Sequence, residues 1–156
     1  MVSTVTTKRG ELHFQRDQVQ RLLNQLAELL EDIADADADS SWNWTAVPTD
    51  AIPDRVTDLC GRLQTLFFLE ETDGALVELL ETQPELRDEV EGLHDEHPRL
   101  LNLLEEIGEL AGSSVRPAST WDDVESRFHR FQRALSGHLQ RHDDLGQRAA
   151  LVAVGE

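Results

Sequence analysis

The sequence is poor in the residues that build sheets, disulfides and membrane spans. Tyrosine is absent, phenylalanine occurs five times in 156 residues, and Cys60 is the only cysteine. A lone cysteine excludes an intramolecular disulfide, so nothing calls for an oxidising compartment and a cytoplasmic location is expected. No apolar run approaches the roughly 18 residues of a membrane span, and residues 1–10 lack the apolar segment of a signal peptide. We therefore expect neither secretion nor membrane insertion.

Positive charge is also scarce. The chain has 31 acidic against 14 basic residues, a formal net charge of -17, and Lys8 is its only lysine. A field of this sign repels phosphate backbones and anionic membrane surfaces. Nucleic acid and membranes are therefore not expected as partners.

Helix-forming residues dominate what remains, with Leu, Glu, Asp, Gln, Arg and Ala the common types. A chain of this length is about one ordinary domain and can bury its own core. We expect a flexible N-terminus over residues 1–10, one all-α domain over 11–149 and a C-terminal tail over 150–156. Long helices with short connections favour antiparallel neighbours, so the expected fold is an up-down-up-down four-helix bundle.

Four stretches repeat core positions at the three- and four-residue spacing of a helix face. These positions are Val19, Leu22, Leu26, Leu29 and Ile33; Val56, Leu59, Leu63, Leu66, Glu70, Asp73, Val77 and Leu80; Leu86, Val90, Leu93, His97, Leu100, Leu104, Ile107 and Ala111; and Val124, Phe128, Phe131, Leu135, His138, His142 and Leu145. Pro98 removes a backbone donor inside the third stretch and predicts a kink or a restart of the helix near His97.

Glu70, His97, His138 and His142 lie on these lines at positions where Leu, Val, Ile or Phe would otherwise be expected. A buried carboxylate or imidazole is destabilising unless it is paired, so together they indicate either ligands of one cation or a metal-free hydrogen-bond network. The four-residue spacing places His138 and His142 on one helix face. A carboxylate with imidazoles suits zinc, iron, nickel or cobalt. The residue types alone leave both readings open.

The order of these residues resembles the haemerythrin-like, or HHE cation-binding, family from about Gln15 to Ala149. The segment Leu66-Phe67-Phe68-Leu69-Glu70-Glu71 resembles the HFxxEE segment of its second helix, Glu96-His97 resembles the EH pair of its third, and Gly137 to Asp143 resembles its fourth-helix motif. Against the family pattern, Gln18 and Leu66 stand in place of histidines and His142 stands in place of a glutamate.

The resemblance implies a haemerythrin-like bundle that holds a single cation per chain, iron or another divalent transition metal. Its expected ligands are Glu70, His97, His138 and His142, with Asp143, Gln18 and His94 as weaker candidates. It also implies handling or sensing of dioxygen, nitric oxide or iron. No nucleophile, base and acid combine into a catalytic constellation, so an enzyme is not expected. The alternative is a bundle that binds no metal and serves as a structural or protein-interaction module.

Overall fold

The protein is helical throughout the part that the structure describes. The computed structural model describes the backbone of residues 2–38, 51–112 and 120–154, and the side chains of residues 10–33, 51–112 and 121–151. Its elements are α1 (Val2–Ala38), α2 (Ala51–Glu71), α3 (Gly74–Thr82), a 3₁₀ turn (Pro84–Leu86), α4 (Arg87–Gly112) and α5 (Thr120–Val154). No strand occurs in these ranges, which confirms the all-α prediction.

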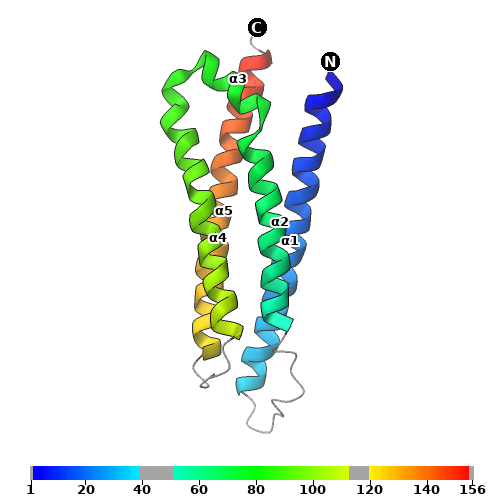
Figure 1. The fold of residues 1–156 in the computed structure, drawn as a ribbon, viewed down its shortest axis with the longest axis vertical. Coiled ribbons are helices and arrows are strands. Elements are labelled where there is room, and N and C mark those ends of the chain that lie inside the picture. The colour runs from blue at the N-terminus through cyan, green and yellow to red at the C-terminus, as the bar shows by residue number, and fades with distance from the viewer. Residues whose placement is uncertain (1, 39–50, 113–119, 155–156) are drawn as a thin grey trace.

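The four long helices lie side by side in an elongated bundle (Figure 1). Around the bundle α1 packs on α2, α2 on α4, α4 on α5 and α5 on α1. The short α3 lies against α5. Successive long helices run in opposite directions along the long axis, as the colours of Figure 1 show. Ion pairs of Glu89 with Arg148 at 3.4 Å and of Glu106 with Arg127 at 3.5 Å agree with opposite directions of α4 and α5.

The first and last helices of the chain extend beyond the predicted domain bounds. Helix α1 begins at Val2, before the predicted domain start at residue 11, and α5 runs past the predicted domain end at residue 149 to Val154. That the N-terminal segment is flexible stays a prediction. No helix in the described ranges is long and apolar enough to cross a membrane.

The break between α2 and α3 changes which residues face the core. Asp73 caps α3 by accepting a hydrogen bond from the backbone nitrogen of Ala75 at 3.0 Å, so a new helix begins instead of the old one continuing. Leu76 and Leu79 are consequently buried. The predicted core positions Val77 and Leu80 were wrong, since Val77 is 55% exposed and Leu80 is only partly buried.

Helix α4, in contrast, continues through Pro98 without a break. A proline inside a helix removes one backbone hydrogen bond, here the one to the carbonyl of His94. The core positions before and after Pro98 remain in phase, with Leu93, His97 and Leu100 all buried. Of the kink or restart predicted near His97, the restart does not occur, and the kink stays a prediction.

The apolar core is divided into two clusters. The larger cluster fills the bundle from the level of Ile33 and Ala111 to that of Phe67 and Leu100. The smaller one consists of Leu76, Leu79, Val90, Leu93, Leu145 and Ala149. Fully buried side chains such as Phe128 and Phe131 each contribute about 1.5–3 kcal/mol to stability through burial. In α1 the buried line includes Leu23 and Leu30, whereas Leu22 and Leu29, which were predicted for it, are only partly buried.

Polar residues separate the two clusters. The buried polar side chains among the described residues are Gln15, Glu70, His97, His138 and His142. Along α2, α4 and α5 these side chains fall between residues of the larger cluster and residues of the smaller one. We call these five residues the polar layer. Helices α1, α2, α4 and α5 all contribute to it.

Candidate metal centre

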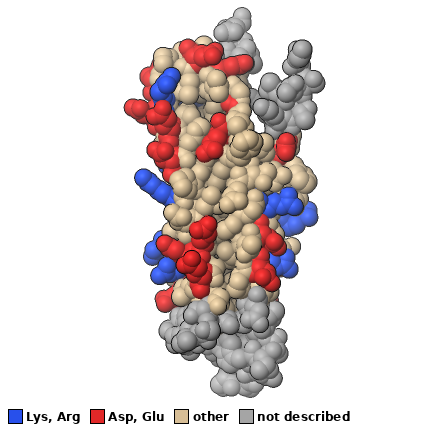
Figure 2. Space-filling model, viewed as in Figure 1, with Lys and Arg blue, Asp and Glu red and all other residues tan. Residues whose placement is uncertain are grey.

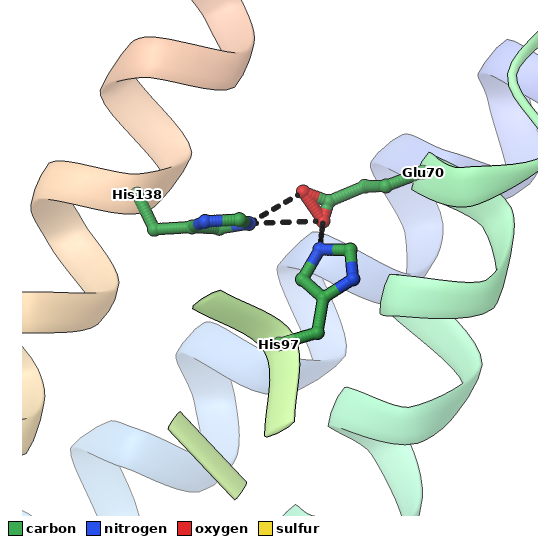
Figure 3. A group of neighbouring side chains, drawn as sticks. All are labelled: Glu70, His97 and His138. Carbon is green, nitrogen blue, oxygen red and sulfur yellow. Dashed lines mark hydrogen bonds and ion pairs between the residues drawn. The ribbon is translucent and has the colours of Figure 1, made fainter. Parts of the chain in front are cut away.

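Three residues of the polar layer converge on one point in the bundle (Figure 3). Glu70 comes from the last turn of α2, His97 from α4 and His138 from α5, and their exposed fractions are 1%, 3% and 0%. One ligand atom from each lies within 4.8 Å of the others. A cation about 2.0–2.2 Å from each donor requires donor atoms up to about 4 Å apart, so the group fits a cation after small side-chain adjustments.

Both imidazoles present the Nε2 atom to the same carboxylate. His138 Nε2 lies 2.9 Å from Glu70 Oε1 and 3.4 Å from Oε2. His97 Nε2 lies 3.5 Å from Glu70 Oε2 and has no hydrogen-bond partner among the described residues. The three side chains therefore direct two nitrogens and two oxygens at a shared centre.

A second carboxylate faces the other nitrogen of each imidazole. His97 Nδ1 lies 3.0 Å from Glu71 Oε1, and His138 Nδ1 lies 3.3 Å from Glu96 Oε1. Arg141 donates a hydrogen bond to the other oxygen of Glu96 and so holds that carboxylate in place. Carboxylates in these positions favour the imidazole tautomer that carries its proton on Nδ1. That tautomer leaves the Nε2 lone pairs directed at the shared centre.

Phe67 holds the two rings in this orientation. Its ring stacks on the imidazole of His97, with centroids 4.1 Å apart and planes 9° from parallel. It also meets the imidazole of His138 edge-on at a centroid distance of 5.5 Å. Because Phe67 is itself buried, neither imidazole has much room to turn.

Burial and nearby charges shift the pKa values of Glu70 and His97 in opposite directions. Burial alone would raise the pKa of Glu70, but interactions with His138 and His97 outweigh it and lower this pKa to about 2. Burial alone would lower the pKa of His97, but the carboxylates of Glu70 and Glu71 outweigh it and raise this pKa above its ordinary value. Without a cation, the group therefore favours a carboxylate beside a protonated imidazole.

The structure keeps the other candidate ligands out of the group. His142 is buried one turn beyond His138, but it does not join the set of atoms within 4.8 Å. Asp143 accepts hydrogen bonds from both terminal guanidinium nitrogens, Nη1 and Nη2, of Arg16 on the outside of the layer. Gln18 lines a surface groove between α1 and α2. The ring of His94 lies 5.6 Å from that of His97, and its Nε2 has no hydrogen-bond partner within the described part of the chain.

Five residues around the site were not predicted as part of it: Gln15, Phe67, Glu71, Glu96 and Arg141, although Phe67, Glu71 and Glu96 lie in the segments that carry the family resemblance. Gln15 precedes Val19 by one turn, so extending the first core line would have included it. Glu71 and Glu96 lie off the core lines of their helices, so the spacing of core positions could not identify them. Each points away from the core line of its own helix, and Glu96 reaches the imidazole of His138 on another helix.

Neither a scan against models of known protein families nor searches among curated proteins and solved structures finds a match for this chain. The fold and the geometry therefore define the class: an all-helical protein with a buried Glu-His-His group that could hold a metal ion.

Proposed function

We propose that this protein is a haemerythrin-like, up-down-up-down bundle that holds one divalent transition cation, iron or zinc-like, between Glu70, His97 and His138. The main support is the arrangement of the two imidazoles of His97 and His138. Both Nε2 atoms face the buried carboxylate of Glu70, and each Nδ1 atom faces a different carboxylate.

A neutral imidazole has only one N–H for its two ring nitrogens. If Nδ1 donates to Glu71 or Glu96, the Nε2 lone pair faces the negative charge of Glu70, which is repulsive. A cation bound to Nε2 and to Glu70 turns that repulsion into attraction, and it also gives the unpartnered Nε2 of His97 a partner.

The charge around the group favours a divalent ion. The carboxylates of Glu70, Glu71 and Glu96 and the guanidinium of Arg141 leave two negative charges when both imidazoles are neutral. Glu70 is almost fully buried, so water does little to screen its charge. A divalent cation neutralises the set.

Two imidazoles and one carboxylate are the donor set of zinc and non-haem iron(II) sites that keep open coordination positions. Such a cation supplies a Lewis-acid centre, and in the case of iron a redox centre, for a small molecule. Together with the resemblance of the sequence, this supports sensing or handling of dioxygen, nitric oxide or iron. The polar layer excludes bulk water and orients the two imidazoles.

The charge of the surface affects which partners the protein attracts. Carboxylates spread over most of the length of the face in Figure 2, with Arg side chains between them. A surface of this kind attracts cations and repels polyanions, which supports metal ions as partners and argues against nucleic acid.

One observation favours a second candidate, a metal-free bundle with a structural or protein-interaction role. The raised pKa of His97 and the lowered pKa of Glu70 describe a buried imidazolium-carboxylate pair that satisfies itself without a cation. In that case the polar layer fixes the register of the helices.

Titration of metal-free protein with Co²⁺, followed by visible absorption and calorimetry, tests the proposal. We expect one equivalent to bind with a ligand-field spectrum of low coordination number. His97→Ala and His138→Ala should abolish binding, while His129→Ala, which changes an exposed histidine on α5, should leave it unchanged. No binding by the native chain would favour the metal-free candidate, and equal binding by all three variants would show that Co²⁺ binds outside this group.

A further inference from the structure

Two phenylalanines remain exposed on neighbouring helices of the bundle. Phe14 on α1 is 53% exposed and Phe68 on α2 is 63% exposed. Phe14 lies one turn before Gln18 and Phe68 one turn after Thr65, and both Gln18 and Thr65 line the groove between α1 and α2. Because these helices run in opposite directions (Figure 1), both phenylalanines lie at the same end of that groove. We call the groove together with Phe14 and Phe68 the α1–α2 face.

The charges of the α1–α2 face cancel, in contrast to those of the whole chain. The groove has a volume of about 520 Å³, and the charged residues of its lining are one acid, Asp58, and one base, Arg62. The chain as a whole has a net charge of -17, so two copies repel each other at a distance. A surface without net charge adds nothing to that repulsion, and its exposed phenylalanines favour association with another apolar surface.

The order of residues along α2 makes this face complementary to itself. Gly61 is exposed in the groove, and a Cβ atom added to it would meet nothing within 4 Å. Asp58 precedes Gly61 and Arg62 follows it. If two copies cross with their α2 helices antiparallel and Gly61 at the two-fold axis, Asp58 of each copy comes within about one helical turn of Arg62 of the other. The same two residues therefore form two ion pairs of opposite orientation.

We propose that the α1–α2 face binds a second copy of this chain in an antiparallel dimer centred on Gly61. Phe14 and Phe68 lie beyond the Thr65 end of the groove, so in this arrangement they cover the Thr57 end of the groove in the other copy. Their apolar surface is thereby removed from water. The exchanged ion pairs of Asp58 and Arg62 fix the register of the two copies. None of these contacts involves the polar layer, so the dimer does not depend on a bound cation.

Sedimentation velocity of the full chain over a wide range of protein concentration tests this dimer. The native chain should pass from monomer to dimer as the concentration rises. Phe68→Ser removes an apolar anchor and Gly61→Glu blocks the close approach, and each should weaken dimerisation at least about tenfold. The matched controls are Leu151→Ser, at a residue of α5 that is 72% exposed, and Gly92→Glu, at a glycine of α4 with open space around it. Both controls should dimerise as the native chain does.

An exchange of charge distinguishes a second copy from any other occupant. Asp58→Arg leaves two basic side chains at the crossing and Arg62→Asp leaves two acidic ones, so each variant alone should dimerise more weakly than the native chain. An equimolar mixture of the two variants should recover dimers, because the ion pairs re-form between unlike copies. A native chain that stays monomeric at every concentration would refute the second copy and leave the face to a partner of different sequence. Dimers that persist unchanged in Phe68→Ser and Gly61→Glu would refute this face as the interface.

Discussion

His138 Nε2 lies 2.9 Å from Glu70 Oε1, in the middle of a bundle whose core is otherwise apolar above and below (Figure 3). The contact joins α5 to the last turn of α2. Each side chain makes the burial of the other tolerable, because an unpaired buried charge destabilises a protein by about 3–5 kcal/mol. Substitutions at this contact therefore separate the contribution of charge from that of shape.

Glu70→Gln keeps the shape of the side chain and removes its charge. We expect divalent cation affinity to fall at least a hundredfold, because the one anionic ligand is lost. Calorimetric titration with Zn²⁺ measures the change. Glu78→Gln, on the exposed surface of α3, should bind as the native chain does, and undiminished binding by Glu70→Gln would contradict the assignment of Glu70 as a ligand.

Glu96 acts on the cation through His138, which it holds at Nδ1. Glu96→Gln should therefore weaken cation affinity by about 10–100-fold without abolishing it. The same calorimetric titration checks this. Glu106→Gln is the matched control, since Glu106 pairs with Arg127 on the same two helices at the surface. An equal loss in both variants would mean that general surface charge, and not the orientation of His138, is responsible.

The core lines of α4 and α5 could be predicted from the sequence because both helices stay in phase over their whole length. On α5 the line from Val124 through Phe131 to Leu145 is buried as predicted, with His138 and His142 on it. An apolar line that includes polar residues is a local signal, so the side chains that the bundle buries could be identified without knowing which helices are neighbours.

The rest depends on contacts between helices, which sequence spacing does not encode. The spacing of α2 predicts Asp73 as a core position. In the structure its carboxylate caps α3, and the core positions of α3 follow a different phase from those of α2. Asp143 was a weaker candidate ligand than His142, and the structure shows it bound by Arg16, 127 residues away in sequence. Residues such as Glu96 and Arg141 meet only after the helices pack.

Gly108 lies where α4 packs tightly against Val56 of α2. A Cβ atom added at this glycine would lie 2.9 Å from Cγ1 of Val56, which is buried and cannot move aside freely. We expect Gly108→Ala to destabilise the protein by about 1–3 kcal/mol through overpacking. Gly61→Ala, where an added Cβ meets nothing within 4 Å, should be neutral or stabilising by up to about 1 kcal/mol because alanine favours helix. Urea denaturation measures both, and equal effects would contradict this packing.

Acid should destabilise the metal-free protein through His142. Burial lowers the pKa of His142 below its ordinary value of 6.5, so between those two values the unfolded chain binds a proton that the folded chain does not. The free energy of unfolding therefore falls as the pH falls through this window. His97, whose pKa is raised, acts in the opposite sense, because its contribution is complete below pH 6.5 and is lost as the pH rises through its folded pKa.

Comparison of His142→Leu with His129→Leu in urea denaturation between pH 5 and pH 7.5 isolates the first effect. The decline below pH 6.5 should be shallower in His142→Leu than in the native chain and unchanged in His129→Leu. A native-like decline in His142→Leu would show that other groups cause it.

Elemental analysis of protein purified without an affinity tag or a chelator determines whether one divalent cation occupies the polar layer. We predict close to one equivalent of a single transition metal per native chain, iron or zinc-like, and none in His138→Ala. Absence of metal from the native chain, even after reconstitution with iron and zinc, would contradict a cation in the polar layer. It would leave the metal-free bundle with a structural or protein-interaction role as the remaining candidate.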